Sequence, residues 1–404
     1  MLNRRETLKS VLAVTIGTIG AGRFSGAAAA EETISLPIGN GDRPLVAYPG
    51  KRPLIRLTTR PPQLETPFSV FDEGLITPND AFFVRYHLAH IPLKIDPDAF
   101  RLNVGGKVDN PLSLSLADLK TGFEPIELTA VNQCAGNGRA FFDPRVPGGQ
   151  IANGAMGNAR WKGVPLKALL AKAGVQAGAV QVSFRGLDEP VLPETPAFVK
   201  ALDLDHANDG EVMVAYAMNG EDLPWLNGYP IRLVPPGRYG TYWIKHLSKI
   251  TVLDAPLDNF WMKSTYRIPN NACACVEPGK APTSTVPIDR LNVRSFMTSV
   301  ADGATVPANH ELALRGIAFD GGSGITDVVV SADGGQTWIG ATLGEDLGRY
   351  SFREWKARVT LSPGKRKLMV RAANRAGQSQ PLEPLWNSAG YMRNVVEVTN
   401  VTAA

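Results

Sequence analysis

The strongest constraint on the fold is a change of residue pattern at the proline-rich segment 277–287. After it, short runs of alternating apolar and polar residues are separated by turn signals such as Asp320-Gly-Gly322 and Asp333-Gly-Gly335. Such alternation with regularly spaced turns is typical of antiparallel strands. The runs cover residues 313–319, 327–332, 338–342, 355–361 and 367–373. The sequence therefore predicts an immunoglobulin-like β-sandwich over 283–404, with Trp338 and Trp355 in its core.

A different pattern precedes the break and predicts a mixed α/β domain over 31–282. Residues 31–75 are rich in proline, which favours an extended, irregular arm. A helix is predicted over Leu166–Ala173, because its apolar residues have helical spacing and Gly174 is a suitable stop. Strands are predicted over 180–184, 231–234 and 250–253. Two domains of class α+β suit a chain of 404 residues, which is too long for one core.

The first 30 residues have the pattern of an export signal. A charged head with paired arginines precedes an uncharged stretch over 10–22, and a run of alanines ends at Ala30. This order predicts a secretory signal cleaved after Ala30. The paired arginines resemble the twin-arginine type, which exports folded proteins, although Thr7 departs from that pattern. We therefore expect a periplasmic protein with no membrane span in its mature form.

Net charge gives little reason to expect a nucleic-acid partner. The chain has 42 basic and 38 acidic residues, a formal charge of +4. The first 30 residues hold four of the basic and one of the acidic residues, so 38 and 37 remain in the rest. A nearly neutral mature protein gives no reason to expect nucleic acid or an acidic membrane surface as a partner.

The cysteines point to one chemically distinctive position. Three cysteines cannot build a disulfide framework, and no CxxCH motif for covalently attached haem occurs. Cys273 and Cys275 form a CxC pair, compatible with burial or with a local disulfide. Cys134 lies instead in a glycine-rich turn, with Arg139 five residues on. A thiolate in a positive environment is a strong ligand for soft metals, whereas the alternative for a single cysteine is a buried apolar side chain.

Two further groups of residues could bind anions. Phe83, Arg85 and His87 alternate, so a strand would place them on one face. An arginine and a histidine on one face can hold a dianion or a phosphate, although an exposed strand face is the alternative. Arg232 and Lys245 flank a segment rich in proline and glycine, which suits a phosphate-bearing cofactor, with ordinary surface charge as the alternative.

Taken in order, five motifs resemble the sulfite oxidase family of molybdenum-cofactor enzymes. The resemblance runs from about residue 80 to the C-terminus, covers both domains, and is greatest for the haem-free exported bacterial members. The motifs are Phe-x-Arg-x-His at 83–87, Gln-Cys-Ala-Gly-Asn at 133–137, Ala-x-x-Met-Asn-Gly at 215–220, Gly-Tyr-Pro-Ile-Arg at 228–232 and Arg-Gly-x-Ala at 315–318.

The resemblance implies a role for each matching residue. Cys134 would be the protein thiolate on molybdenum, beside the dithiolene sulfurs of the pterin. The anion pocket would contain Arg85, Arg139 and Arg315, with Tyr266 beside the metal. The residues that would hold the pterin and its phosphate are Phe83, Arg85, His87, Asp188, Asn227, Arg232, Trp243 and Lys245. Asn227 and Trp243 stand where vertebrate members have histidine, and Gly138 stands where many members have arginine.

This resemblance implies oxidation of sulfite to sulfate by a homodimer that pairs through its second domain. Because the chain has no haem motif, the electrons would pass singly to an external c-type cytochrome. One alternative is another molybdenum chemistry, the reduction of nitrate or of a sulfoxide. Three arginines favour the sulfite dianion over nitrate, and the sandwich argues against a sulfoxide reductase. A non-enzymatic exported binding or adhesion protein is the second alternative, and it would contain no molybdenum.

Overall fold

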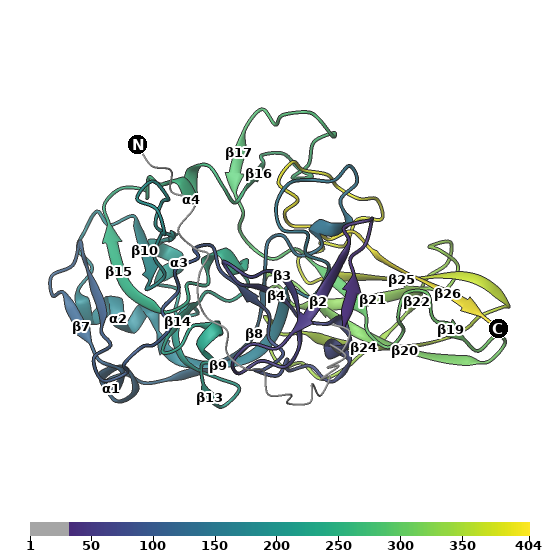
Figure 1. Ribbon diagram of the computed structural model, residues 1–404, viewed down its shortest axis with the longest axis horizontal. Helices are drawn as coiled ribbons and strands as arrows, with labels where there is room; N and C mark the ends of the chain where they lie inside the picture. Colours follow the sequence, from purple (N-terminus) through teal and green to yellow (C-terminus); the bar gives the residue numbers. More distant parts are fainter. Residues whose placement is uncertain (1–31) are drawn as a thin grey trace, which may run out of the picture. The chain divides into compact units, whose positions relative to one another are not determined.

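The computed structural model describes residues 32–404, so the predicted signal over 1–30 lies outside the described residues. Residues Thr33–Ala404 form one compact unit. Figure 1 shows their path through the strands and short helices. Within residues 32–404 no helix is both long and apolar enough to cross a membrane.

The segment predicted as an irregular arm forms most of a small antiparallel sheet, so that prediction is wrong. Its apolar runs are long enough to pair between the prolines, as the buried Leu54 and Leu64 show. The sheet order is β1-β2-β3-β4-β5. These strands are β1 (Thr33–Ser35), β2 (Asp42–Val46), β3 (Leu54–Thr58), β4 (Gln63–Glu65) and β5 (Val84–Arg85).

Two larger sheets build the predicted mixed domain. The first has the order β11-β10-β15-β6-β7, in which only β15 and β6 run parallel. In the second, the order is β13-β12-β9-β8, and β14 also pairs with β12. Their strands are β6 (Leu102–Gly106), β7 (Leu112–Leu114), β8 (Ile126–Gln133), β9 (Met156–Pro165), β10 (Gln181–Gly186), β11 (Val199–Asp203), β12 (Met213–Met218), β13 (Glu221–Asp222), β14 (Arg232–Val234) and β15 (Leu247–Leu253).

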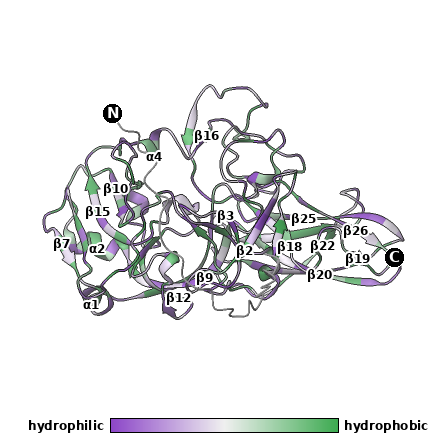
Figure 2. Ribbon diagram, in the orientation of Figure 1, coloured by the Kyte–Doolittle hydropathy of each residue, from purple (hydrophilic) through white to green (hydrophobic). Residues whose placement is uncertain are grey.

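Short helices connect and cover these sheets. The predicted helix is confirmed as α2 (Leu166–Ala173), which buries its apolar face and ends at Gly174 with φ of 70°. Figure 2 colours β15 largely as hydrophobic and the arm strand β2 largely as hydrophilic. The remaining helices are α1 (Leu116–Thr121), α3 (Leu204–Ala207), α4 (Phe260–Lys263) and the 3-10 turns η1 (Phe68–Asp72), η2 (Arg139–Phe141), η3 (Trp225–Asn227) and η4 (Gly240–Tyr242).

The predicted sandwich is confirmed after a connecting hairpin of β16 (Arg267–Pro269) and β17 (Thr285–Pro287). Its two sheets have the orders β18-β20-β24-β23 and β19-β26-β25-β21-β22. The strands are β18 (Arg294–Met297), β19 (Thr305–Val306), β20 (Glu311–Phe319), β21 (Ile325–Ser331), β22 (Ile339–Gly340), β23 (Thr342–Leu343), β24 (Arg353–Thr360), β25 (Gly364–Asn374) and β26 (Glu397–Ala403).

Only one of the two tryptophans predicted for the sandwich core lies there. Trp355 is completely buried among the apolar side chains of both sheets. Trp338 is half-buried, because it follows directly on the turn at 333–335 and its Nε1 donates to the carbonyl of Gly335 at 3.1 Å. A residue tied to its own turn cannot reach the space between the sheets.

Glu65, at the end of β4, is a completely buried carboxyl that supports the chain leading into β9. It accepts hydrogen bonds from the backbone amides of Ala152 and Gly154 at 3.1 and 2.7 Å. Burial raises the pKa of Glu65 from 4.5 to about 7, against the lowering effect of these two amides. The unfolded chain therefore loses this proton first, and stability falls as pH rises from about 4.5 to about 7.

Replacing Glu65 by glutamine should remove this pH dependence. Relative to wild type, the free energy of unfolding of Glu65→Gln should rise by about 3 kcal/mol between pH 4.5 and pH 7.5, at 1.36 kcal/mol per pKa unit. Urea unfolding at a series of pH values measures it, with Glu124→Gln on the exposed surface as the matched control. A difference that stays constant over this range would show that Glu65 does not titrate as proposed.

Candidate active site

Cys134 lies at the junction of two cavities. It follows β8 directly, and its half-buried side chain carries the one free thiol of residues 32–404, because Cys273 and Cys275 form a disulfide. The inner cavity has an empty volume of about 450 Å³, of which about 30 Å³ can hold the centres of water molecules, and it is lined by Cys134 together with Phe83, Asn132, Asn227, Arg232, Thr241 and Lys245. The outer cavity, about 510 Å³, is lined by Cys134 together with Arg139, Gly148, Trp261, Arg267 and Tyr391. Arg85, His87 and Tyr266 line both.

Two glycines allow Arg139 to fold back beside Cys134. A Cβ at Gly136 would lie 2.8 Å from the guanidinium, and one at Gly148 would lie 3.0 Å from it. The Arg139 side chain donates to the carbonyls of Ala389 and Gly149, and its guanidinium lies 5.1 Å from the ring of Tyr391. These partners are neutral, so the buried positive charge stays available to an anion.

His87 and Tyr266 line the same two cavities as Cys134 and form a hydrogen-bonded pair. His87 Nε2 and the Tyr266 hydroxyl form a short hydrogen bond, and the imidazole stacks on Phe198 at 3.8 Å. Burial, reinforced by the charge of Arg85, lowers the pKa of His87 well below its usual range, so the ring is neutral. Burial also raises the pKa of Tyr266 well above its usual range, so its hydroxyl keeps its proton.

The backbone of Tyr266 supports a functional role for this pair. Its φ is 56°, a left-handed conformation that is unfavourable for an aromatic residue. The ring stacks on Tyr391 at 5.3 Å, and the buried Lys200 lies 5.4 Å from its centre. Packing on both sides therefore holds the hydroxyl toward the cavities.

The inner cavity has an excess of buried positive charge. Arg232 donates to the backbone carbonyls of Asn227 and Trp243, and its guanidinium lies 5.0 and 5.4 Å from the ring centres of Trp161 and Trp243. Burial lowers its pKa to about 9. Burial and the charge of Arg232 lower the pKa of Lys245 to about 7, while Asp188 acts in the opposite direction. Two desolvated cations beside one carboxylate would be stabilised by a bound anionic group.

Two of the residues predicted to hold the cofactor lie behind the cavity wall. Asp188 is buried, its pKa is raised by burial, and the charge of Lys245 partly offsets that rise. Trp243 donates from Nε1 to the carbonyl of Arg238 and packs on Arg232. Neither side chain lines the cavity. Asp188 influences it through the charge of Lys245, and Trp243 through its packing on Arg232. Phe83 and Asn227 line the inner cavity as expected.

Arg315 does not join this site, which corrects its assignment to the anion pocket. Along β20, Leu314 and Gly316 are buried, and alternation turns Arg315 outward. The Arg315 side chain is half exposed and pairs with Asp72 of η1 at 2.5 Å. Its charge is therefore neutralised at a contact between the sandwich and the first domain, outside both cavities. Of the three arginines expected to favour sulfite over nitrate, only Arg85 and Arg139 line the cavities.

Sequence reasoning missed several residues of the site. Asn132 and Cys134 are two residues apart at the end of β8, so period-two alternation could have placed them on one face. Thr241 lies between Arg232 and Lys245 in the chain, but no motif marks it. Lys51 comes from the arm and donates to Asn227 Oδ1 at 2.5 Å. No local signal could have identified Lys51, because 176 residues separate the two partners.

Comparisons with known proteins agree with this architecture. Residues 87–261 match the family described as the oxidoreductase molybdopterin binding domain, and residues 285–402 match the Mo-co oxidoreductase dimerisation domain. The fold and the site thus define a molybdopterin-dependent oxidoreductase. The structure resembles the crystal structure of the sulfane dehydrogenase SoxCD from Paracoccus pantotrophus, with a TM-score of 0.71, 25% identity and coverage of 96% of both chains.

Sequence relatives narrow the class to one family. Mitochondrial sulfite oxidases from Macaca fascicularis and Homo sapiens are each 34% identical, over 89% and 87% of this chain. The match covers 68% and 66% of their lengths, so the chain spans about two thirds of these relatives. NADH nitrate reductase from Solanum lycopersicum is 30% identical over 84% of this chain and 40% of its own length. The chain belongs to the sulfite oxidase family of molybdenum enzymes.

The residues of the inner cavity fit a molybdenum-pterin cofactor. Among residues 32–404, Asn132 Oδ1, Thr241 Oγ1 and Arg232 Nε are buried polar atoms without a hydrogen-bond partner. Gly240 keeps this space open, since a Cβ there would lie 2.7 Å from Asn132 Oδ1. Buried polar groups are nearly always hydrogen-bonded in folded proteins. These atoms, with the two cations, suit the polar rings and the phosphate of a pterin, and the thiol of Cys134 would supply a sulfur ligand.

Proposed function

We propose that this protein oxidises sulfite to sulfate at a molybdenum cofactor and passes the electrons singly to an external c-type cytochrome. The observation that carries the proposal is the position of Cys134 between a cationic inner cavity and an outer cavity containing Arg85 and Arg139. The inner side suits an anionic cofactor, and the outer side suits an anionic substrate. Sulfite oxidases among the relatives support sulfite as that substrate.

Each residue of the outer cavity has a defined part in this reaction. Arg85 and Arg139 bind the anion's oxygens, while the Tyr266 hydroxyl accepts from Nε2–H of neutral His87 and so keeps its own proton as a further donor to the anion. When bound, the cofactor supplies the oxygen-atom transfer and accepts two electrons. Overall, sulfite and water give sulfate, two protons and two electrons, and two molecules of a one-electron acceptor are reduced. The guanidiniums keep the charge of the anion compensated as sulfite becomes sulfate.

The setting of the reaction is part of the proposal. The twin-arginine pattern in the first 30 residues supports export to the periplasm, where c-type cytochromes are available as acceptors. The match to a dimerisation domain over 285–402 supports a homodimer. We propose that this domain pairs two copies of the chain.

Steady-state assays test the proposed reaction directly. Protein matured in a host that makes the cofactor should contain about one molybdenum per chain and reduce cytochrome c when sulfite is added. The same preparation should not oxidise a reduced dye with nitrate. Activity with nitrate but not with sulfite would show that nitrate is the substrate. Protein that contains molybdenum but turns over neither anion would contradict the proposed function. If protein made in that host contained no molybdenum, its assignment as a molybdenum enzyme would be wrong.

A further inference from the structure

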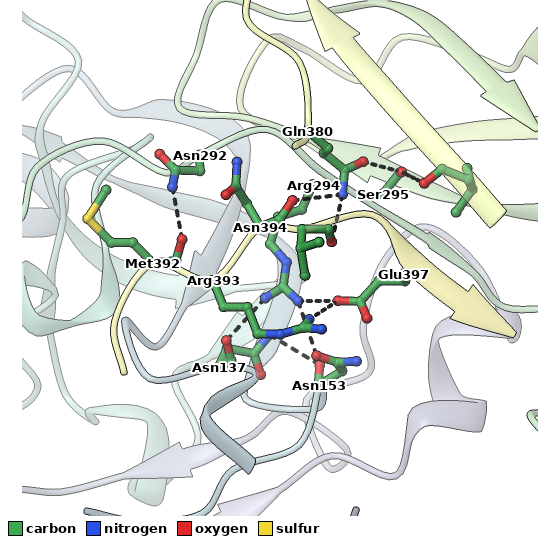
Figure 3. Close-up of polar contacts among 12 residues, drawn as sticks. Asn137, Asn153, Asn292, Arg294, Ser295, Gln380, Met392, Arg393, Asn394 and Glu397 are labelled. Atoms are coloured by element: carbon green, nitrogen blue, oxygen red, sulfur yellow. Dashed lines mark hydrogen bonds and ion pairs between the residues drawn. The ribbon is translucent and has the colours of Figure 1, made fainter. Parts of the chain in front are cut away.

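The sandwich domain supplies a buried arginine to the loop that carries Cys134. Arg294, the first residue of β18, is completely buried. Its guanidinium donates to the carbonyl of Asn137 at 3.2 Å, to Asn153 Oδ1 at 3.1 Å and to Glu397 Oε1 at 2.8 Å (Figure 3). Two of these acceptors belong to the first domain and one to the second. A single side chain therefore bridges the two domains beside the thiol.

Asn137 is the residue through which this bridge reaches Cys134. Its amide nitrogen donates to the carbonyl of Cys134 at 3.0 Å, and its Oδ1 accepts from the amide of Ala155 at 2.9 Å. Cys134 in turn donates from its amide to the carbonyl of Ala155 at 2.9 Å. The turn is thus fixed to the chain entering β9, and Arg294 holds the one carbonyl of Asn137 that faces the sandwich.

A second arginine shares the carboxylate of this bridge, so the three side chains together carry one net positive charge. Arg393 pairs with the same oxygen of Glu397 at 2.6 Å, and both side chains are largely buried. Its aliphatic part packs on the turn, since a Cβ at Gly138, where φ is 91°, would lie 3.0 Å from Arg393 Cδ. The preceding residue, Met392, donates from its backbone amide to the carbonyl of Ala135 at 2.9 Å. The sandwich therefore contacts the turn at three residues, Ala135, Asn137 and Gly138, and the contacts at Ala135 and Asn137 are made to backbone carbonyls.

We propose that Arg294 is a positioning residue that fixes the Cys134 turn from the second domain and so sets the direction of the thiol. Hydrogen bonds from a charged donor to buried acceptors are stronger than neutral ones and are costly to break. Loss of Arg294 would leave the Asn137 carbonyl and Asn153 Oδ1 without this donor, and the turn would open more often. This inference deepens the proposed function, because it concerns the proposed metal ligand.

The test measures exposure of the thiol and does not depend on sulfite. Full-length protein from a host that does not make the cofactor is alkylated with iodoacetamide, and the rate at Cys134 is followed by mass spectrometry. In Arg294→Met the rate should rise by about 10- to 100-fold, as expected when charged hydrogen bonds that close a local opening are lost. Arg294→Lys keeps the charge and part of the bonding, so it should restore most of the protection.

Arg315→Gln is the matched control, because it breaks another ion pair between the sandwich and the first domain without touching the turn. A rate in Arg294→Met more than fivefold above that of Arg315→Gln supports the proposal, and any smaller ratio overturns it. Glu397 keeps Arg393 as a partner when Arg294 is replaced, which favours folding of the variant. If Arg294→Met does not fold, Asn153→Ala serves as the second variant, because it removes one acceptor of the Arg294 guanidinium. Alkylation of Cys134 in Asn153→Ala must then be at least twofold faster than in Arg315→Gln. Because this experiment measures exposure of the thiol, a negative result would contradict the role of Arg294 and would leave the proposed oxidation of sulfite to its own assay.

Discussion

Replacing Cys134 by serine is expected to lower the rate of sulfite oxidation by at least about 1,000-fold, or about 4 kcal/mol at 1.36 kcal/mol per tenfold change. Serine preserves the size of the side chain but replaces a soft sulfur donor by a harder, less acidic oxygen. The turn itself should persist, because the hydrogen bonds of Cys134 to Ala155 and Asn137 come from its backbone. Turnover with sulfite and cytochrome c, normalised to bound molybdenum, measures the effect.

The matched control is the double replacement of Cys273 and Cys275 by serine. These cysteines form a disulfide in the hairpin loop between β16 and β17, and neither lines a cavity that contains Cys134. Their loss should change turnover by less than about twofold, as expected for a change outside the site. If Cys134→Ser retained half of the wild-type rate, Cys134 would have a structural role and the assignment as metal ligand would be wrong.

Replacing Arg139 by glutamine is expected to lower kcat/KM for sulfite by about 100- to 1,000-fold, the range found when one donor to a developing anion is removed. Its guanidinium is buried, contacts only neutral protein groups among the residues described, and lines the outer cavity. Glutamine keeps a hydrogen-bond donor but has no charge. The negative charge of sulfite would therefore be less well compensated in the outer cavity.

Arg315→Gln separates this effect from a general loss of positive charge. Arg315 was expected in the same pocket from the sequence, but it pairs with Asp72 outside both cavities. Its replacement should leave kcat/KM within about twofold of wild type, as is usual for exposed ion pairs. Equal losses in both variants would place Arg315 in the substrate site after all, while an unchanged Arg139→Gln would remove Arg139 from it.

The parts of the site that sequence could predict are those carried by one continuous segment. Cys134 and Arg139 are five residues apart, and Gly136 between them, with Gly148 further along, makes the fold-back of the guanidinium sterically possible. Arg85 and His87 are brought together as the alternation suggested, although β5 includes only Val84 and Arg85. Local spacing was sufficient because the backbone has few ways to separate such near neighbours.

Partners distant in the chain could not be predicted in this way. Lys51 binds Asn227, and Arg294 binds Asn137, through contacts that only the complete fold creates. Whereas those contacts were missed, Arg315 was wrongly assigned to the site. A short motif suggested a role in the anion pocket, but the alternation of side chains along β20 turns Arg315 away from it. The fold class, a mixed domain followed by a β-sandwich, was accessible from the sequence, since it depends on repeated patterns of many residues. Individual long-range pairs depend on single side chains.

The arginine bridge also constrains how this architecture can change over generations. Arg294 and the carbonyls that it holds are encoded more than 140 positions apart, on opposite sides of the proline-rich break. A gene that exchanged its second domain with that of a relative lacking this arginine would inherit an intact first domain but a thiol turn without its support. Such an exchange is expected to need compensating substitutions around Gly138, so the two domains act as a matched pair at this turn.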